Sequence, residues 1–128
     1  MTKRTGLIAT KIGNSSYYDD TGKSLPVTIL KVDQCIVSDI RTIEKNGYTS
    51  VQLVSIDGKK ELKKLKKPQQ KLFANLKINP KKIIKEFRVD NENLLDIGSV
   101  LNVSHFKTNQ FVDVTSKSIG KGFAGAMK

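Results

Sequence analysis

Short runs of strand-forming residues, separated by turn signals, fill the first half of the chain and constrain its fold more than any other feature. Apolar and β-branched content and alternation predict strands over residues 7–12, 16–18, 25–32, 35–42 and 48–56. Turn signals separate them at Gly13-Asn14, Asp19 to Gly22, Glu44 to Gly47 (with an Asn-Gly hairpin signal) and Asp57-Gly58. Many short strands at this spacing are typical of a β-sandwich or a small barrel.

The run 35–42 shows a clear alternation of side chains. A regular strand there places Ile36 and Ile40 on one face, and Val37 with Asp39 on the other. The run 25–32 is nearly all apolar or β-branched, and Pro26 stands near its start, where no ladder N–H is lost. We therefore expect these two runs to be strands.

The pattern changes after residue 58. Pro68 is expected to end any helix near Lys67, and a short helix is predicted over residues 69–78 with Leu72, Phe73 and Leu76 facing inward. Strand character returns at residues 83–89, 100–103 and 111–115. The tail from residue 116 to 128 is rich in glycine and lysine, and it is not expected to fold by itself.

The charge of the chain is concentrated in one segment. The 128 residues include 23 Lys and Arg against 12 Asp and Glu, a net charge of +11. Residues 59–88 alone carry twelve basic and two acidic residues. A chain of this length holds one domain, and such a localised excess is the electrostatic footprint of a protein that binds a phosphate backbone.

The lysine run is the first candidate site, because a lysine suits phosphate oxygens without reading base sequence. A solvated surface segment is the alternative interpretation. The candidate residues are Lys59, Lys60, Lys63, Lys64, Lys66, Lys67 and Lys71.

The C-terminal tail is the second candidate site. Gly120-Lys121-Gly122 is not a phosphate-binding P-loop, because Gly122 stands where that motif needs Ser or Thr. Glycines among lysines, with Lys128 at the end, suit a backbone that lies closely along RNA. A floppy terminus is the alternative, and the local sequence does not separate the two.

No constellation of catalytic residues is found. Cys35 and His105 are the only Cys and His, and no spacing argues that they act together. One Cys and one His also cannot build a zinc site. We expect no metal, no cofactor and no small-molecule substrate. The N-terminus has no apolar signal region, and no apolar run is long enough for a membrane span. A lone cysteine favours a reducing compartment.

These residues together resemble bacterial ribosomal protein L3 of the large subunit, along the whole chain. The resemblance is carried by stretches in one collinear order: Gly6-Leu7-Ile8, Lys11-Ile12-Gly13, Gly22 with Pro26-Val27-Thr28, Gly47-Tyr48 with Val51-Gln52-Leu53, Lys67-Pro68 with Phe73, Glu86-Phe87-Arg88, and Val112 to Thr115 leading to Gly120 to Gly125 and Lys128. The last stretch is the most specific. The chain departs from the family at Asn14-Ser15, Lys71-Leu72 and Ser116 to Ile119.

The resemblance implies a mainly β fold, a small translation-type β-barrel with one short helix and an irregular basic tail. Residues 1–116 would form the barrel with a basic insertion at 59–82, and residues 117–128 would begin an RNA-penetrating extension. Family members continue past this point, so we expect an incomplete barrel with an open edge. The implied partners are large-subunit ribosomal RNA and neighbouring ribosomal proteins, in the cytoplasm, with a role in subunit assembly and no enzymatic activity.

Two other classes of function remain open on the sequence. One is a general nucleic-acid-binding barrel outside the ribosome, of the transcription or cold-shock type. The other is an enzyme on a translation-type or flavin-reductase-like barrel, against which the missing catalytic constellation stands. A membrane-surface role is weaker, because the lysine run lacks a wide apolar face.

Overall fold

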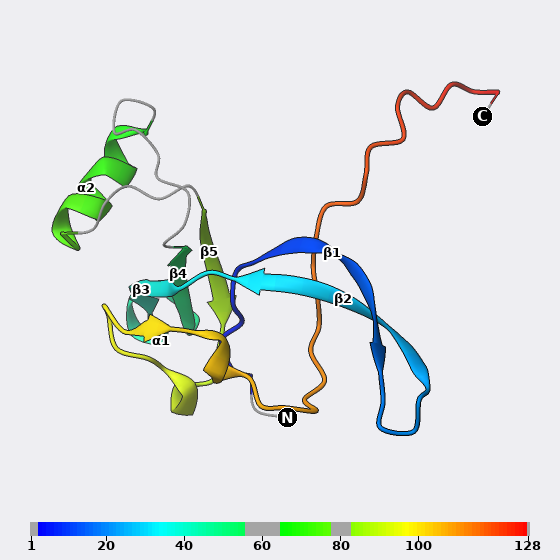
Figure 1. Cartoon of the computed structure of the whole chain (residues 1–128). Helices are drawn as coiled ribbons and strands as arrows, with labels where there is room; N and C mark the ends of the chain where they lie inside the picture. The colour runs from blue at the N-terminus through cyan, green and yellow to red at the C-terminus, as the bar shows by residue number, and fades with distance from the viewer. Residues whose placement is uncertain (1–2, 56–64, 78–82, 128) are drawn as a thin grey trace.

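The structure, a computed structural model, describes residues 3–55, 65–77 and 83–127 (Figure 1). Three strands come first, short helices and 3-10 turns stand between or after the later strands, and little of the described chain is helical. In chain order the elements are β1 (Ala9–Tyr18), β2 (Ser24–Val32), β3 (Cys35–Arg41), α1 (Ile43–Asn46), β4 (Ser50–Ser55), α2 (Lys67–Asn75), β5 (Ile84–Arg88), the 3-10 turn Asn91–Asn93, β6 (Val100–Leu101) and the 3-10 turn Val103–His105.

Strands β1 and β2 form a long antiparallel hairpin of their own. Asp19 to Gly22 make the turn, and the Gly22 N–H donates to the Asp19 carbonyl over 2.8 Å. The prediction that Gly13-Asn14 ends the first strand is wrong, because β1 continues to Tyr18 with a register shift between Lys11 and Gly13. Ile12 forms a β-bulge in the ladder with β2. The strand therefore continues through Gly13-Asn14 instead of ending there.

The second sheet holds four antiparallel strands in the order β5-β4-β3-β6. The register between β3 and β4 shifts between Val37 and Asp39, which makes Ser38 an extra residue. The Ser38 hydroxyl donates to the Gln52 carbonyl at 3.1 Å and lies 2.9 Å from Gln52 Oε1. This bulge overturns the predicted alternation, because it returns Ile40 to the face that carries Val37.

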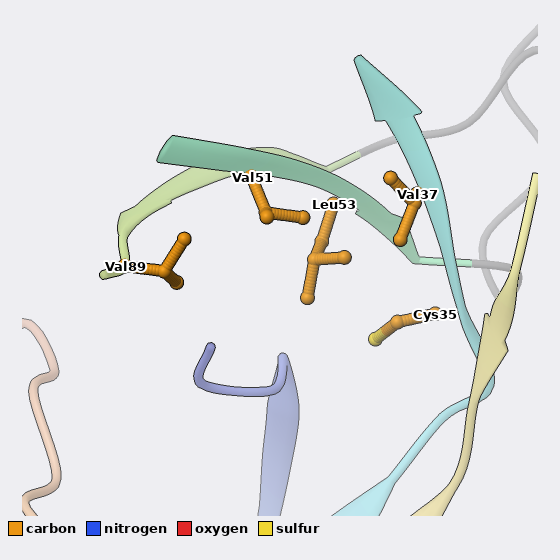
Figure 2. Close-up of a cluster of buried hydrophobic side chains, with 5 residues drawn as sticks. All are labelled: Cys35, Val37, Val51, Leu53 and Val89. Carbon is orange, nitrogen blue, oxygen red and sulfur yellow. The ribbon is translucent and has the colours of Figure 1, made fainter. Parts of the chain in front are cut away.

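The main core lies on one face of this sheet. Figure 2 shows its buried side chains, which come from β3, from β4 and from the residue after β5: Cys35, Val37, Val51, Leu53 and Val89. The segment before β1 packs against them through Leu7 and Ile8. There a Cβ on Gly6 would stand only 2.6 Å from the Phe87 ring, so a side chain at that position would collide with the packing.

A smaller cluster forms on the opposite face of the sheet and holds α2 in place. Phe73 of α2 and Leu65 before it pack against Val54 and Ile84. The predicted helix is confirmed with Phe73 buried, but it begins two residues earlier than expected, at Lys67. Pro68 stands in its first turn, where a missing N–H costs no helical hydrogen bond, so this proline begins the helix instead of excluding it.

Strands β3 and β4 are antiparallel neighbours, as the Asn-Gly signal predicts. The turn that joins them, however, differs from the predicted hairpin turn. Residues 43–46 form the helical turn α1, and Gly47 ends it in the left-handed conformation at φ 78°. The Gly47 N–H donates to the Ile43 carbonyl. Asn-Gly therefore serves as a helix C-terminus here and not as a two-residue hairpin turn.

The mainly β class is confirmed, but the part of the chain that the structure describes forms no closed barrel. Strands β1 and β2 pair only with each other, so the two sheets stay separate. The strand predicted over 111–115 is also wrong, because these residues run as exposed, unpaired chain. Phe111 in this stretch is fully exposed. Its side chain has no sheet to bury against, so alternation alone does not make a strand there.

Within the described ranges, no helix has the length and apolarity required to cross a membrane. The predicted turn at residues 57–58 and the lysine-rich segment at 59–64 lie outside the described residues.

Candidate nucleic-acid interface

Helix α2 presents the described part of the lysine run. Lys67 and Lys71 are one helical turn apart and share a face, whereas Phe73 lies about 200° around the helix from Lys71. Because Phe73 is buried against the sheet, both lysines point away from it and are exposed. Lys66 precedes the first turn and is exposed as well. The fold therefore places Lys67 and Lys71 on one outward face of α2, with Lys66 exposed just before the helix.

The segment leading into α2 is held by a local hydrogen bond. Gln70 Nε2 donates to the Leu65 carbonyl over 2.8 Å, and Leu65 is buried. This contact fixes the chain at the point where the lysine run enters the helix. Four candidate lysines lie outside the described residues, as does the C-terminal lysine: Lys59, Lys60, Lys63, Lys64 and Lys128.

The C-terminal tail forms a second, separate basic segment. Gly120, Lys121 and Gly122 are exposed, and Gly122 has a φ of 72°, which favours glycine. Figure 1 shows the tail running away from both sheets, on the side opposite to α2. Phe123 in this tail is also almost fully exposed. The structure therefore does not bring the two predicted basic segments together.

A row of polar side chains that the sequence analysis missed crosses the sheet on the face opposite to the main core. Arg41 of β3, Ser50 of β4 and Arg88 of β5 are direct partners in register. The Arg41 guanidinium lies 3.6 Å from the Asp39 carboxylate. Two arginines separated by 47 residues thus flank the same serine, a proximity that only strand pairing creates.

A hydrogen-bond network joins Ser50, Glu86 and Tyr48 beside Arg88. Ser50 Oγ donates to the Glu86 carboxylate over 2.7 Å, and the Tyr48 hydroxyl donates to the same group. These two bonds, the Ser50 bond first, hold the pKa of Glu86 below its usual range. The bond to Glu86 correspondingly raises the pKa of Tyr48. The Arg88 guanidinium carbon lies 5.3 Å from the centre of the Tyr48 ring, within cation–π range.

Glu86→Gln is expected to change how stability depends on pH. Because the folded-state pKa of Glu86 is lowered, its ionised form stabilises the fold fully above the unfolded value of about 4.3, and this contribution is lost as the pH falls through the folded value. The difference in free energy of unfolding between wild type and variant should therefore shrink between pH 7 and pH 3. Urea titrations at each pH measure it. Glu44→Gln, in exposed α1, is the control, and an equal pH dependence for both variants would contradict the network.

The two residues considered for catalysis, His105 and Cys35, each lie close to a backbone carbonyl group. His105 Nε2 lies 2.9 Å from the carbonyl oxygen of buried Thr5. Cys35 is fully buried in the core, its thiol lies 3.4 Å from the Asp33 carbonyl, and burial raises its pKa. Among the described residues, no group of three or more His, Cys, Asp or Glu side chains is arranged to hold a metal ion.

Comparison with known proteins finds one family over most of the chain. Residues 18–128 match the family model of ribosomal protein L3. The large ribosomal subunit protein uL3 of Rickettsia akari is 48% identical over 125 residues, 98% of this chain and 57% of that protein. The proteins of the same name from Rickettsia prowazekii and Rickettsia typhi are each 46% identical over the same shares.

The chain spans a little more than half of the length of these curated relatives. The match covers β2 through the C-terminal tail and so includes the four-stranded sheet, α2 and the basic segments, whereas β1 precedes it except for Tyr18. On the family match and on this level of identity, the chain belongs to the ribosomal protein L3 family.

Proposed function

We propose that this chain binds large-subunit ribosomal RNA as a structural, non-enzymatic constituent of the ribosome and supports assembly of the subunit. Membership of the ribosomal protein L3 family carries this proposal. The relatives are named as proteins of the large ribosomal subunit. Ribosomal RNA, neighbouring large-subunit proteins and a cytoplasmic location follow for this chain as parts of the same proposal.

The distribution of charge supports RNA as the ligand. Lys67 and Lys71 form an outward cationic surface on a helix that buried Phe73 holds against the sheet, and Lys66 is exposed just before that helix. Each phosphate that a lysine neutralises releases condensed counterions, so binding gains free energy without reading base sequence. The lysines of residues 59–64, next to this surface in sequence, would extend it.

The tail supports a second mode of contact. Gly120, Lys121 and Gly122 are exposed on chain that leaves the folded part. A backbone without Cβ atoms approaches RNA closely, and Lys121 and Lys128 would neutralise phosphates there. We propose that residues 117–128 start an RNA-penetrating extension, and that residues 1–116 belong to one incomplete translation-type barrel with a basic insertion at 59–82. Recognition would be mainly of RNA shape, because A-form grooves hide base edges from side chains.

A general nucleic-acid-binding module outside the ribosome is the second candidate, since lysines on a helix serve any polyanion. Competition between structured large-subunit ribosomal RNA and random duplex DNA separates the two. Unlabelled ribosomal RNA should displace a labelled RNA probe from the chain at a lower concentration than the duplex DNA does. Equal displacement would favour the general module.

A further inference from the structure

A shallow depression at the end of the four-stranded sheet has a composition that neither basic segment shares. It is open to solvent, has a volume of about 390 Å³, and lies between the α1 turn and the chain that leaves β5. The charged and polar side chains that line it are Lys3, Tyr48, Thr49, Arg88, Asp90 and Asn91. This volume falls within the range of small-ligand sites, which begins at about 300 Å³.

The Arg88 guanidinium lies within cation–π range of the Tyr48 ring at this depression. Arg88 lies 5.3 Å from the ring centre, and the Tyr48 hydroxyl is tied to Glu86, which Ser50 also holds. Single-stranded RNA is recognised by stacking unpaired bases on aromatic rings and on guanidinium planes. Because the hydrogen bond to Glu86 holds the Tyr48 ring, that ring gives a base a surface at little cost in side-chain entropy.

The polar groups around the pair suit a nucleotide better than an apolar ligand. Lys3 supplies a cation at the rim, and its backbone N–H is anchored by the Asp90 carboxylate over 2.6 Å. Thr49 donates its hydroxyl to Asn91 Oδ1 over 2.7 Å, so the Asn91 amide N–H groups remain available as donors. A Cβ on Gly47 would meet no atom within 4 Å, so the wall at that residue is open.

We propose that this depression is a binding site for one unpaired RNA nucleotide, whose base stacks on the Arg88–Tyr48 pair while Lys3 faces its phosphate. The inference rests on the proposed RNA-binding function and adds to it a contact that senses a base. The lysines of α2 interact with phosphate charge alone. Two stretches that carry the family resemblance, Gly47-Tyr48 and Glu86 to Arg88, meet at this site.

The test compares two fluorescein-labelled probes with equal phosphate charge, hexauridylate and an abasic hexamer, by anisotropy with the full 128-residue chain. Stacking of one base predicts that wild type binds hexauridylate at least about fivefold more tightly than the abasic probe. Tyr48→Leu and Arg88→Lys should bring this ratio close to one, since each removes a stacking plane and Arg88→Lys keeps the charge. Tyr48→Phe keeps the ring and should keep the preference.

Matched substitutions elsewhere serve as controls. Tyr18→Leu removes an exposed tyrosine near the hairpin turn, and Arg4→Lys makes the same change of cation at an exposed position. Both should leave the ratio unchanged. A wild-type ratio near one, or a ratio that survives Arg88→Lys and Tyr48→Leu, would overturn the site. Arg88 is exposed, so Arg88→Lys tests the nucleotide site even if Tyr48→Leu disturbs folding.

The two proposals fail in distinguishable ways. Loss of preference for ribosomal RNA over duplex DNA, with the base-dependent ratio intact, would refute the ribosomal role and leave the nucleotide site standing. Selective binding of ribosomal RNA, with equal affinity for hexauridylate and the abasic hexamer, would refute the nucleotide site and leave the ribosomal role standing.

Discussion

Leu53→Ala is expected to lower the free energy of unfolding by about 2–5 kcal/mol, the largest stability effect of any substitution considered. Leu53 stands on β4, which pairs with both β3 and β5, and its side chain is completely buried in the main core. Truncation removes the favourable transfer of its methyl groups from water and leaves a cavity that strands paired on both sides cannot close. Guanidinium titration followed by far-ultraviolet circular dichroism measures the loss.

Leu25→Ala on β2 is the matched control, because it deletes the same atoms from a side chain that is 39% exposed. A substitution at such a surface position usually changes stability by less than about 0.5 kcal/mol. Equal losses at the two positions would contradict a core confined to the four-stranded sheet, and would show that the face of β2 carrying Leu25 is packed in solution.

The second large effect concerns RNA binding. Simultaneous substitution of Lys66, Lys67 and Lys71 by Ala is expected to reduce the slope of log affinity against log salt by about 2 to 3, at 0.7–0.9 for each lost phosphate contact. The three lysines are exposed around α2, and none belongs to the packing that buries Phe73. The fold should therefore survive while the affinity for RNA at low salt falls. Filter binding across a salt series measures the slope.

A variant with the same change of charge at a distance provides the comparison. Lys11, Lys23 and Lys45 are exposed on the hairpin and on α1, away from the lysine run. Their simultaneous replacement by Ala removes an equal net charge, so it reports the general electrostatic effect. If both triple variants show the same slope of log affinity against log salt, the α2 surface is not part of the RNA interface.

Local sequence signals were sufficient where an element is specified by its own residues. The apolar run of β2 and the alternating run of β4 are strands, as predicted, because each fits one pleated surface without interruption. The same holds for α2, whose burial of Phe73 follows from its helical spacing. Its start was misplaced because Pro68 ends a helix in one context and begins one in another.

Features created by pairing were not accessible from the sequence. The bulge at Ser38 depends on the register with Gln52, and it changes which residues of β3 reach the core. Strand-like alternation at 111–115 lacks a partner strand among the described residues, and these residues do not form a strand.

The candidate site divides in the same way. The lysines of α2 were found because a charge run is visible along the chain. The Tyr48, Glu86 and Arg88 network was missed because strand pairing brings β5 beside β4, across 38 to 40 residues of sequence. Only the alternation of β5, which puts Glu86 and Arg88 on one face, hinted at it.

Recognition of ribosomal RNA is tested by binding of the purified chain to large-subunit ribosomal RNA fragments, titrated across salt with random RNA as competitor. We expect selective binding of the ribosomal fragments with a steep salt dependence, because a shaped cationic surface and not charge alone would recognise folded RNA. Equal binding of ribosomal and random RNA at every salt concentration would contradict it.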